Sequence, residues 1–161
     1  MKAVINTSPL ISLSILKKLD VLPMLFEEIY IPTSVFQEAV IVGKGKYGSA
    51  DIEHSNWLKT AEITNTDLRD SIALSLDYGE SEVITLAKEL EINTVIIDEY
   101  AGRRYAKMLD INVVGTLGIL LKAKEKGIVQ QIKPLMELLL NYRRYIDRSL
   151  FEKVLYIAGE T

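Results

Sequence analysis

The sequence predicts an α/β fold in which helices cover both faces of a central parallel sheet. Two observations underlie this fold class and its organisation as one domain. Short β-branched runs alternate with longer segments of helical periodicity, which is the pattern of strand–helix–strand units. The 161 residues also contain no internal repeat, low-complexity tract or long linker, so we expect one domain over 1–161. Within it, 129–158 is expected to form a helical C-terminal extension packed on the remainder.

The β-branched runs define the strands, of which TVIIDE is the clearest. The expected strands are 3–6, 28–32, 57–63, 94–99 and 111–115, with 57–63 as an edge strand. Helical patterns fill most of the remaining sequence. The expected helices are one that starts at Ser8, then 20–26, 33–42, 67–77, 80–91, 100–109, 116–127 and all of 129–158.

Local signals mark where several helices begin. Ser8 and Pro9 are typical of an N-cap and a first-turn proline. Capping-box spacing relates Ser34 to Gln37, and the same spacing recurs between Ser149 and Glu152. These pairs predict helix starts close to Ser34 and Ser149.

Two motifs combine basic residues with glycine or with aromatic residues. GKGKYG matches G-x-G-x-x-G, but a helix precedes it where a dinucleotide fingerprint needs a strand. We therefore expect 43–51 to be a loop.

NYRRYIDR, at 141–148, interleaves aromatic residues with arginines, which suits base stacking and phosphate contact. A subunit interface or a plain amphipathic helix would use the same residue types.

Composition excludes several kinds of chemistry. The chain has no cysteine and a single histidine, His54, which we expect at the surface, so thiolate and multi-histidine metal sites are excluded. Metal chemistry must therefore use oxygen ligands, which favour Mg²⁺ or Mn²⁺. The sequence has no leader pattern and no apolar run near the roughly 20 residues of a membrane span, so we expect a cytoplasmic protein. Its net charge of −3 argues against nonspecific coating of nucleic acid.

Polar residues collect at one predicted edge of the sheet. Asn6 and Asp98 each follow a strand, and the carboxyl ends of parallel strands share an edge. Glu80 lies in the first turn of a helix, on the side of its inward stripe, whereas Glu82 is expected to face solvent. Glu38 borders the apolar face of 33–42. Each carboxylate also has an ordinary interpretation, as a helix-dipole partner, an exposed residue or a helix cap.

Five segments together resemble a known family. VINTSPLI, IPTSVFQEA, GESEVITLA, IIDEYAGRRYA and VVGTLGILLKAK are similar, in order, to motifs of PIN-domain proteins, and most similar to the PIN-like group related to VapC-type toxins. The similarity covers residues 1 to about 127. It implies a three-layer α/β/α sandwich and a Mg²⁺- or Mn²⁺-dependent ribonuclease. It also implies RNA and a small antitoxin protein as partners; a homodimer is a further expectation.

The resemblance also implies roles for individual residues. Asn6, Glu80 and Asp98 would hold the metal, and Glu38 would join Glu80 and Asp98 in catalysis by orienting or deprotonating the attacking water. The remaining matched positions would support the site, and they are Ser8, Arg103 and Thr116.

Asn6 departs from the family pattern, which usually has an aspartate there. Its amide offers a carbonyl oxygen but no negative charge. A catalytically inactive PIN-like module that binds RNA or a protein is therefore the principal alternative to a nuclease. A phosphatase-like or receiver-like pocket ranks lower, because such sites need an aspartate at that strand end.

Overall fold

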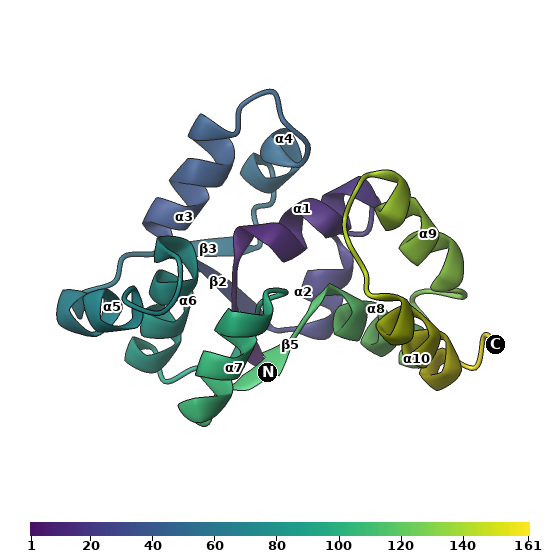
Figure 1. Ribbon diagram of the computed structural model, residues 1–161. Coiled ribbons are helices and arrows are strands. Elements are labelled where there is room, and N and C mark those ends of the chain that lie inside the picture. The colour runs from purple at the N-terminus through teal and green to yellow at the C-terminus, as the bar shows by residue number, and fades with distance from the viewer.

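The computed structural model describes residues 1–161 and contains one sheet of five parallel strands (Figure 1). The strand order is β3-β2-β1-β4-β5, so the first strand lies in the middle and the third at an edge. The strands are β1 (Lys2–Ile5), β2 (Glu28–Pro32), β3 (Leu58–Ala61), β4 (Thr94–Ile96) and β5 (Asn112–Val114). The five expected strands and the edge position of β3 are thus confirmed.

Helices cover both faces of this sheet, and the fold is a three-layer α/β/α sandwich. The helices are α1 (Thr7–Ile15), α2 (Val21–Leu25), α3 (Thr33–Gln37), the π-helical η1 (Glu38–Val42), α4 (Ser49–Glu53), α5 (Thr66–Ile72), α6 (Tyr78–Glu89), α7 (Tyr100–Met108), α8 (Thr116–Glu125), α9 (Lys133–Asn141) and α10 (Arg148–Ala158). In Figure 1, α9 and α10 lie beside α8 at one end of the molecule, while α3 and α4 extend beyond β2 and β3.

The alternation of side chains along β1 divides the core into two parts. Ala3 and Ile5 face a cluster built with residues of α1, α2, α8, α9 and α10. Val4 faces the other side, where α5, α6 and α7 supply the apolar contacts. The central strand β1 is therefore buried on both faces, as is usual for strands of a parallel sheet.

The register of β1 and β4 determines where the site forms. Val4 pairs with Val95 and Ile5 with Ile96, and the amide of Asn6 donates to the carbonyl of Ile96 at 3.1 Å. The chain segments that leave these two strands therefore start side by side at the carboxyl edge of the sheet.

The capping roles predicted for Ser8 and Ser34 were wrong. Helix α1 begins at Thr7, because the sheet ends at Asn6 and the chain turns at once, so Ser8 lies in the first turn. Helix α3 begins at Thr33 directly after Pro32, without a side-chain cap. The hydroxyl of Ser34 donates to Glu82 in place of a helix amide.

Two predicted segment boundaries also differ. The loop expected at 43–51 ends early, because Gly48 adopts a left-handed conformation and α4 starts at Ser49. The continuous helix expected at 129–158 is divided between α9 and α10. Arg143, with φ of 60°, lies in that break, and Asp147 caps α10 through the Ser149 amide at 3.1 Å.

Candidate functional site

Glu80 is a buried carboxylate at the start of α6. The side chain of Asp77 caps this helix by accepting a hydrogen bond from the Glu80 amide at 2.8 Å. Only 1% of Glu80 is exposed, and its Oε1 atom has no hydrogen-bond partner. Burial, followed by the nearby charges of Asp77 and Glu99, raises the pKa of Glu80 to about 7.

A glycine on α7 allows this burial. A Cβ atom added to Gly102 would lie 3.0 Å from Glu80 Oε2 and 3.1 Å from Ile97 Cγ2. No larger residue would fit without displacing the carboxylate or the strand, so α7 approaches Glu80 closely only because residue 102 is glycine.

Three carboxylates meet at this point. One oxygen from each of Asp77, Glu80 and Glu99 lies within 4.8 Å of the others. Asp77 and Glu99 are exposed, so the group is open to solvent on one side. Oxygen ligands on converging carboxylates are the usual means of holding Mg²⁺ or Mn²⁺.

Asn6 lies beside this group. A Cβ added to Gly79 would be 3.6 Å from Asn6 Oδ1 and 3.7 Å from Asp77 Oδ1, so both oxygens border Gly79. The amide of Asn6 is therefore a neutral neighbour of the carboxylates, at the strand end where the sequence predicted it.

Asp98 is held by the start of α8. Its two oxygens accept hydrogen bonds from the amide and the hydroxyl of Thr116, each at 2.7 Å. Arg103 lies close by and donates to the carbonyl of Ile97 at 3.1 Å. A Cβ on Gly115 would lie 2.6 Å from Arg103 Nη1 and 3.1 Å from Asp98 Oδ1, so this glycine gives both side chains room.

Glu38 and Ser8 occupy other positions. Glu38 is exposed on η1 and is not part of the three-carboxylate group. The hydroxyl of Ser8 accepts a hydrogen bond from Arg144 at 2.9 Å, which links α1 to the segment between α9 and α10.

The expectation that Glu82 faces solvent was wrong. Glu82 is 3% exposed, pairs with Arg69 at 2.8 Å and accepts a hydrogen bond from Ser34. Helical periodicity correctly placed Glu82 away from the apolar stripe of α6. However, α5 covers that side of α6 and places Arg69 there.

Asp77 and Glu99 were missed by sequence reasoning, although each lies near a predicted residue. Asp77 is three residues before Glu80, the spacing of an N-cap, and Glu99 directly follows Asp98. The sequence shows where a strand ends but not which of two consecutive acids turns towards Glu80.

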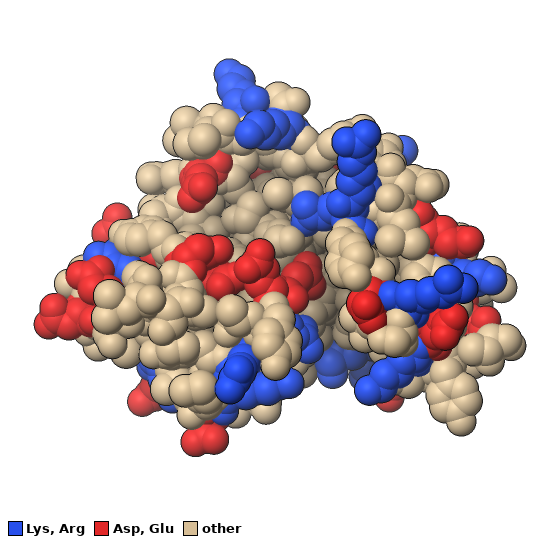
Figure 2. Space-filling view, viewed as in Figure 1, with Lys and Arg blue, Asp and Glu red and all other residues tan.

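The acidic residues form a visible band on one face. Figure 2 shows red side chains across the middle of this face, over the starts of α6 and α7. Lysines and arginines lie on either side of the band, above it and over the α9–α10 end. An anionic polymer would be repelled by such a band unless a cation lay between them.

A family model described as a PIN domain matches residues 2–160. The chain belongs to the PIN-domain family. This PIN domain combines a nuclease-like α/β/α fold with an acidic group of the kind that holds a divalent metal. Comparisons with curated proteins and with solved structures gave no match. None of its helices has the length and apolar character needed to cross a membrane.

Proposed function

We propose that this PIN domain is a Mg²⁺- or Mn²⁺-dependent endoribonuclease. The observation that carries the proposal is the Glu80 carboxylate, which is buried, lacks a partner on Oε1 and lies against two other carboxylates. A buried charge without a counterion is unfavourable, and a cation supplied from solution would remove that cost.

The residues present fit a hard divalent ion. Asp77, Glu80 and Glu99 would hold it through oxygen, and the Asn6 carbonyl and the Asp98 carboxylate would complete its surroundings, directly or through water. When bound, the ion supplies positive charge for the transferred phosphoryl group and lowers the pKa of water.

The chain's own residues would supply the remaining functions. Thr116 holds Asp98 in one orientation through both oxygens. Glu38, exposed on the segment that follows α3, is our candidate to orient the attacking water. Arg103, fixed to the Ile97 carbonyl, would place a guanidinium beside Asp98, where it can contact a phosphate oxygen.

We further propose that the protein is the toxin of a toxin–antitoxin pair, with a small antitoxin protein as partner. This extension depends on the resemblance of VINTSPLI and the later motifs to the group related to VapC-type toxins. Homodimer formation and a cytoplasmic location are parts of the same proposal.

An inactive PIN-like module that binds RNA or protein is the second candidate. Asn6 favours it, because an amide contributes no charge to a site that binds a dication.

Cleavage assays separate the two candidates. We expect wild-type protein with Mn²⁺ to cleave single-stranded RNA, Glu80→Gln to lose at least 100-fold in rate, and Glu125→Gln, a change of an exposed carboxylate on α8, to behave as wild type. An inactive wild type together with an active Asn6→Asp variant would identify a relative that has lost activity. Cleavage by wild type at a rate that Glu80→Gln equals would disprove the proposed site.

A further inference from the structure

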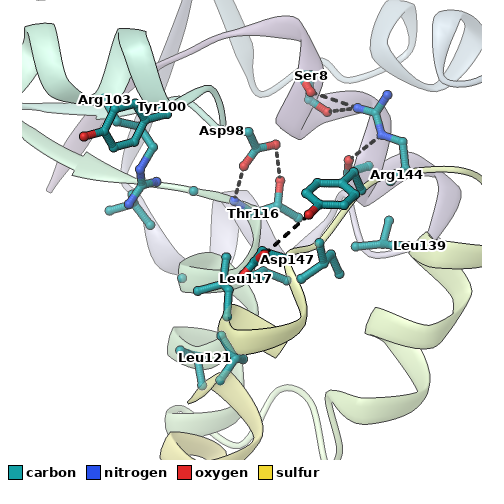
Figure 3. Close-up of a pocket in the computed structure, with 18 of the residues that line it drawn as sticks. Ser8, Asp98, Tyr100, Arg103, Thr116, Leu117, Leu121, Leu139, Arg144 and Asp147 are labelled. Atoms are coloured by element: carbon teal, nitrogen blue, oxygen red, sulfur yellow. Dashed lines mark hydrogen bonds between the residues drawn. The ribbon is translucent and has the colours of Figure 1, made fainter. Parts of the chain in front are cut away.

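A large pocket adjoins the candidate metal site. It has a volume of about 1000 Å³ and lies between α8, α10 and the segment 142–147. Figure 3 shows Asp98 at its edge, with Tyr100 and Arg103 on one side and Arg144 on the other. Asp98 also immediately precedes Glu99 of the three-carboxylate group, so the pocket and the acidic group are neighbouring parts of one surface.

The pocket combines an apolar floor with exposed aromatic rings. Leu117, Leu121 and Val154 are among the apolar residues that line it. Tyr100 is 77% exposed and Tyr145 is 86% exposed, and both line the pocket. Exposed tyrosines beside an apolar surface offer ring faces on which bases can stack.

The lining is positively charged although the chain as a whole is acidic. Five cations, Arg103, Lys122, Arg143, Arg144 and Lys153, line the pocket with only two carboxylates, Asp98 and Asp147. The local net charge is +3, whereas the chain carries −3. An occupant with negative charge is therefore favoured.

Several of these cations have no partner within the protein. The two carboxylates already accept hydrogen bonds, Asp98 from Thr116 and Asp147 from Ser149. The side chains of Lys122, Arg143 and Lys153 take part in no hydrogen bond or ion pair within the chain. They are free to contact phosphates.

We infer that this pocket is the binding subsite for single-stranded RNA next to the cleavage position, with bases on Tyr100, Tyr145 and the apolar floor and phosphates on Lys122, Arg143 and Lys153. The inference rests on the proposed function, because it takes the occupant to be the substrate. It assigns a role to α10 and to the segment 142–147, which lies within the NYRRYIDR motif. A peptide of a partner protein is the competing occupant, but three unpaired cations around an apolar floor match a polyanion that carries bases better.

Binding is measured apart from cleavage, by fluorescence anisotropy of a labelled 12-nucleotide RNA of mixed sequence in EDTA. We expect Lys122→Gln/Lys153→Gln to reduce the slope of log affinity against log salt by about 1.4, the value for two lost phosphate contacts. The double variant Lys107→Gln/Lys126→Gln, which changes two exposed lysines outside the pocket, should match wild type.

A second pair of variants tests stacking. We expect Tyr145→Ala to weaken RNA binding roughly 5- to 150-fold, the effect of losing one base–aromatic stack. Tyr156→Ala removes a comparably exposed ring on α10 that does not line the pocket, and it should bind as wild type. In wild-type protein, RNA containing 4-thiouridine should cross-link to peptides that contain Tyr100 or Tyr145.

The outcomes separate the two proposals. Pocket variants that bind RNA as tightly as their controls, or cross-links confined to other segments, would overturn the subsite and leave the pocket to a protein partner, even if the protein cleaves RNA. Loss of binding in the pocket variants alone would support the subsite, even if wild type with Mn²⁺ proves inactive and the nuclease proposal fails.

Discussion

Asp98 accepts two hydrogen bonds from Thr116, eighteen positions later in the chain, one from the amide and one from the hydroxyl, both at 2.7 Å. Thr116 is the first residue of α8, whose N-cap position, Gly115, has no side chain to cap the helix. The carboxylate at the end of β4 therefore performs the capping, and it gains the favourable dipole of a helix N-terminus. The same contact orients Asp98 and anchors the start of α8.

Thr116→Val should lower the free energy of unfolding by roughly 1.5–3 kcal/mol, because it removes a buried hydrogen bond to a charged group and keeps the side-chain shape. Urea denaturation followed by circular dichroism measures the change. Thr116→Ser, which retains the hydroxyl, should recover most of the stability. If Thr116→Val and wild type had the same urea midpoint of unfolding, the hydroxyl would contribute nothing to stability.

Glu80→Gln should alter how stability depends on pH. The pKa of Glu80 is about 7 in the folded protein and 4.5 as an ordinary carboxyl, so the folded state binds more protons than the unfolded state between these values. Stability therefore falls as pH rises from 4.5 to 7, and the loss is complete above pH 7. Without metal, we expect Glu80→Gln to be about 1–3 kcal/mol more stable than wild type at pH 8, and close to it at pH 4.

Denaturation of both proteins across this pH range, in EDTA, provides the measurement. Only the difference between wild type and variant is informative, because other groups titrate in both. Glu125→Gln, exposed on α8, should give a difference near zero at every pH. A constant difference between wild type and Glu80→Gln would show that Glu80 titrates normally.

Mn²⁺ affinity should depend on pH through the same residue. A proton and a cation compete for the Glu80 carboxylate, so affinity should rise about tenfold per pH unit below 7 and level off above it. Titration calorimetry at pH 6, 7 and 8 would measure this, with Glu80→Gln as the variant that binds weakly throughout. Affinity that does not change with pH would place the ion elsewhere.

The contrast between Glu80 and Glu82 shows what the sequence can predict. Alternating side chains and β-branched runs located every strand, and the strand ends located Asn6 and Asp98, because these features depend on local chain geometry. The surroundings of Glu82 depend on α5, whose placement against α6 is a tertiary contact. The break at 142–147 contains neither proline nor glycine, so no local signal marked it; Arg143 adopts its left-handed conformation where Arg144 is bonded to α1.

Arg69 and Glu82 form a largely buried ion pair that joins α5 to α6. Glu82 lies two positions after Glu80 on α6. The guanidinium also stacks on the Tyr78 ring, 4.7 Å from its centroid. Arg69→Met should cost about 3 kcal/mol of stability, because it leaves the Glu82 carboxylate without its counterion. Adding Glu82→Gln to that variant should recover part of the loss. Arg104→Met, a change of an exposed arginine on α7, is the matched control, and a loss equal to that control would contradict the prediction.

Arg144 attaches the segment between α9 and α10 to α1. Its guanidinium donates to the carbonyl and the hydroxyl of Ser8, both at 2.9 Å, and to the hydroxyl of Ser12 at 3.0 Å. Arg144→Leu should lower the free energy of unfolding by about 1–3 kcal/mol and speed amide hydrogen exchange at 142–147, because the fork that spans both serines is lost.

Arg144→Lys should give an intermediate result, since an ammonium group cannot reproduce the planar fork. Arg143→Leu changes the neighbouring arginine, which has a φ of 60° but whose side chain makes no such bonds, and its exchange should match wild type. Faster exchange in Arg143→Leu than in Arg144→Leu would mean that backbone strain, and not the serine contacts, controls this segment.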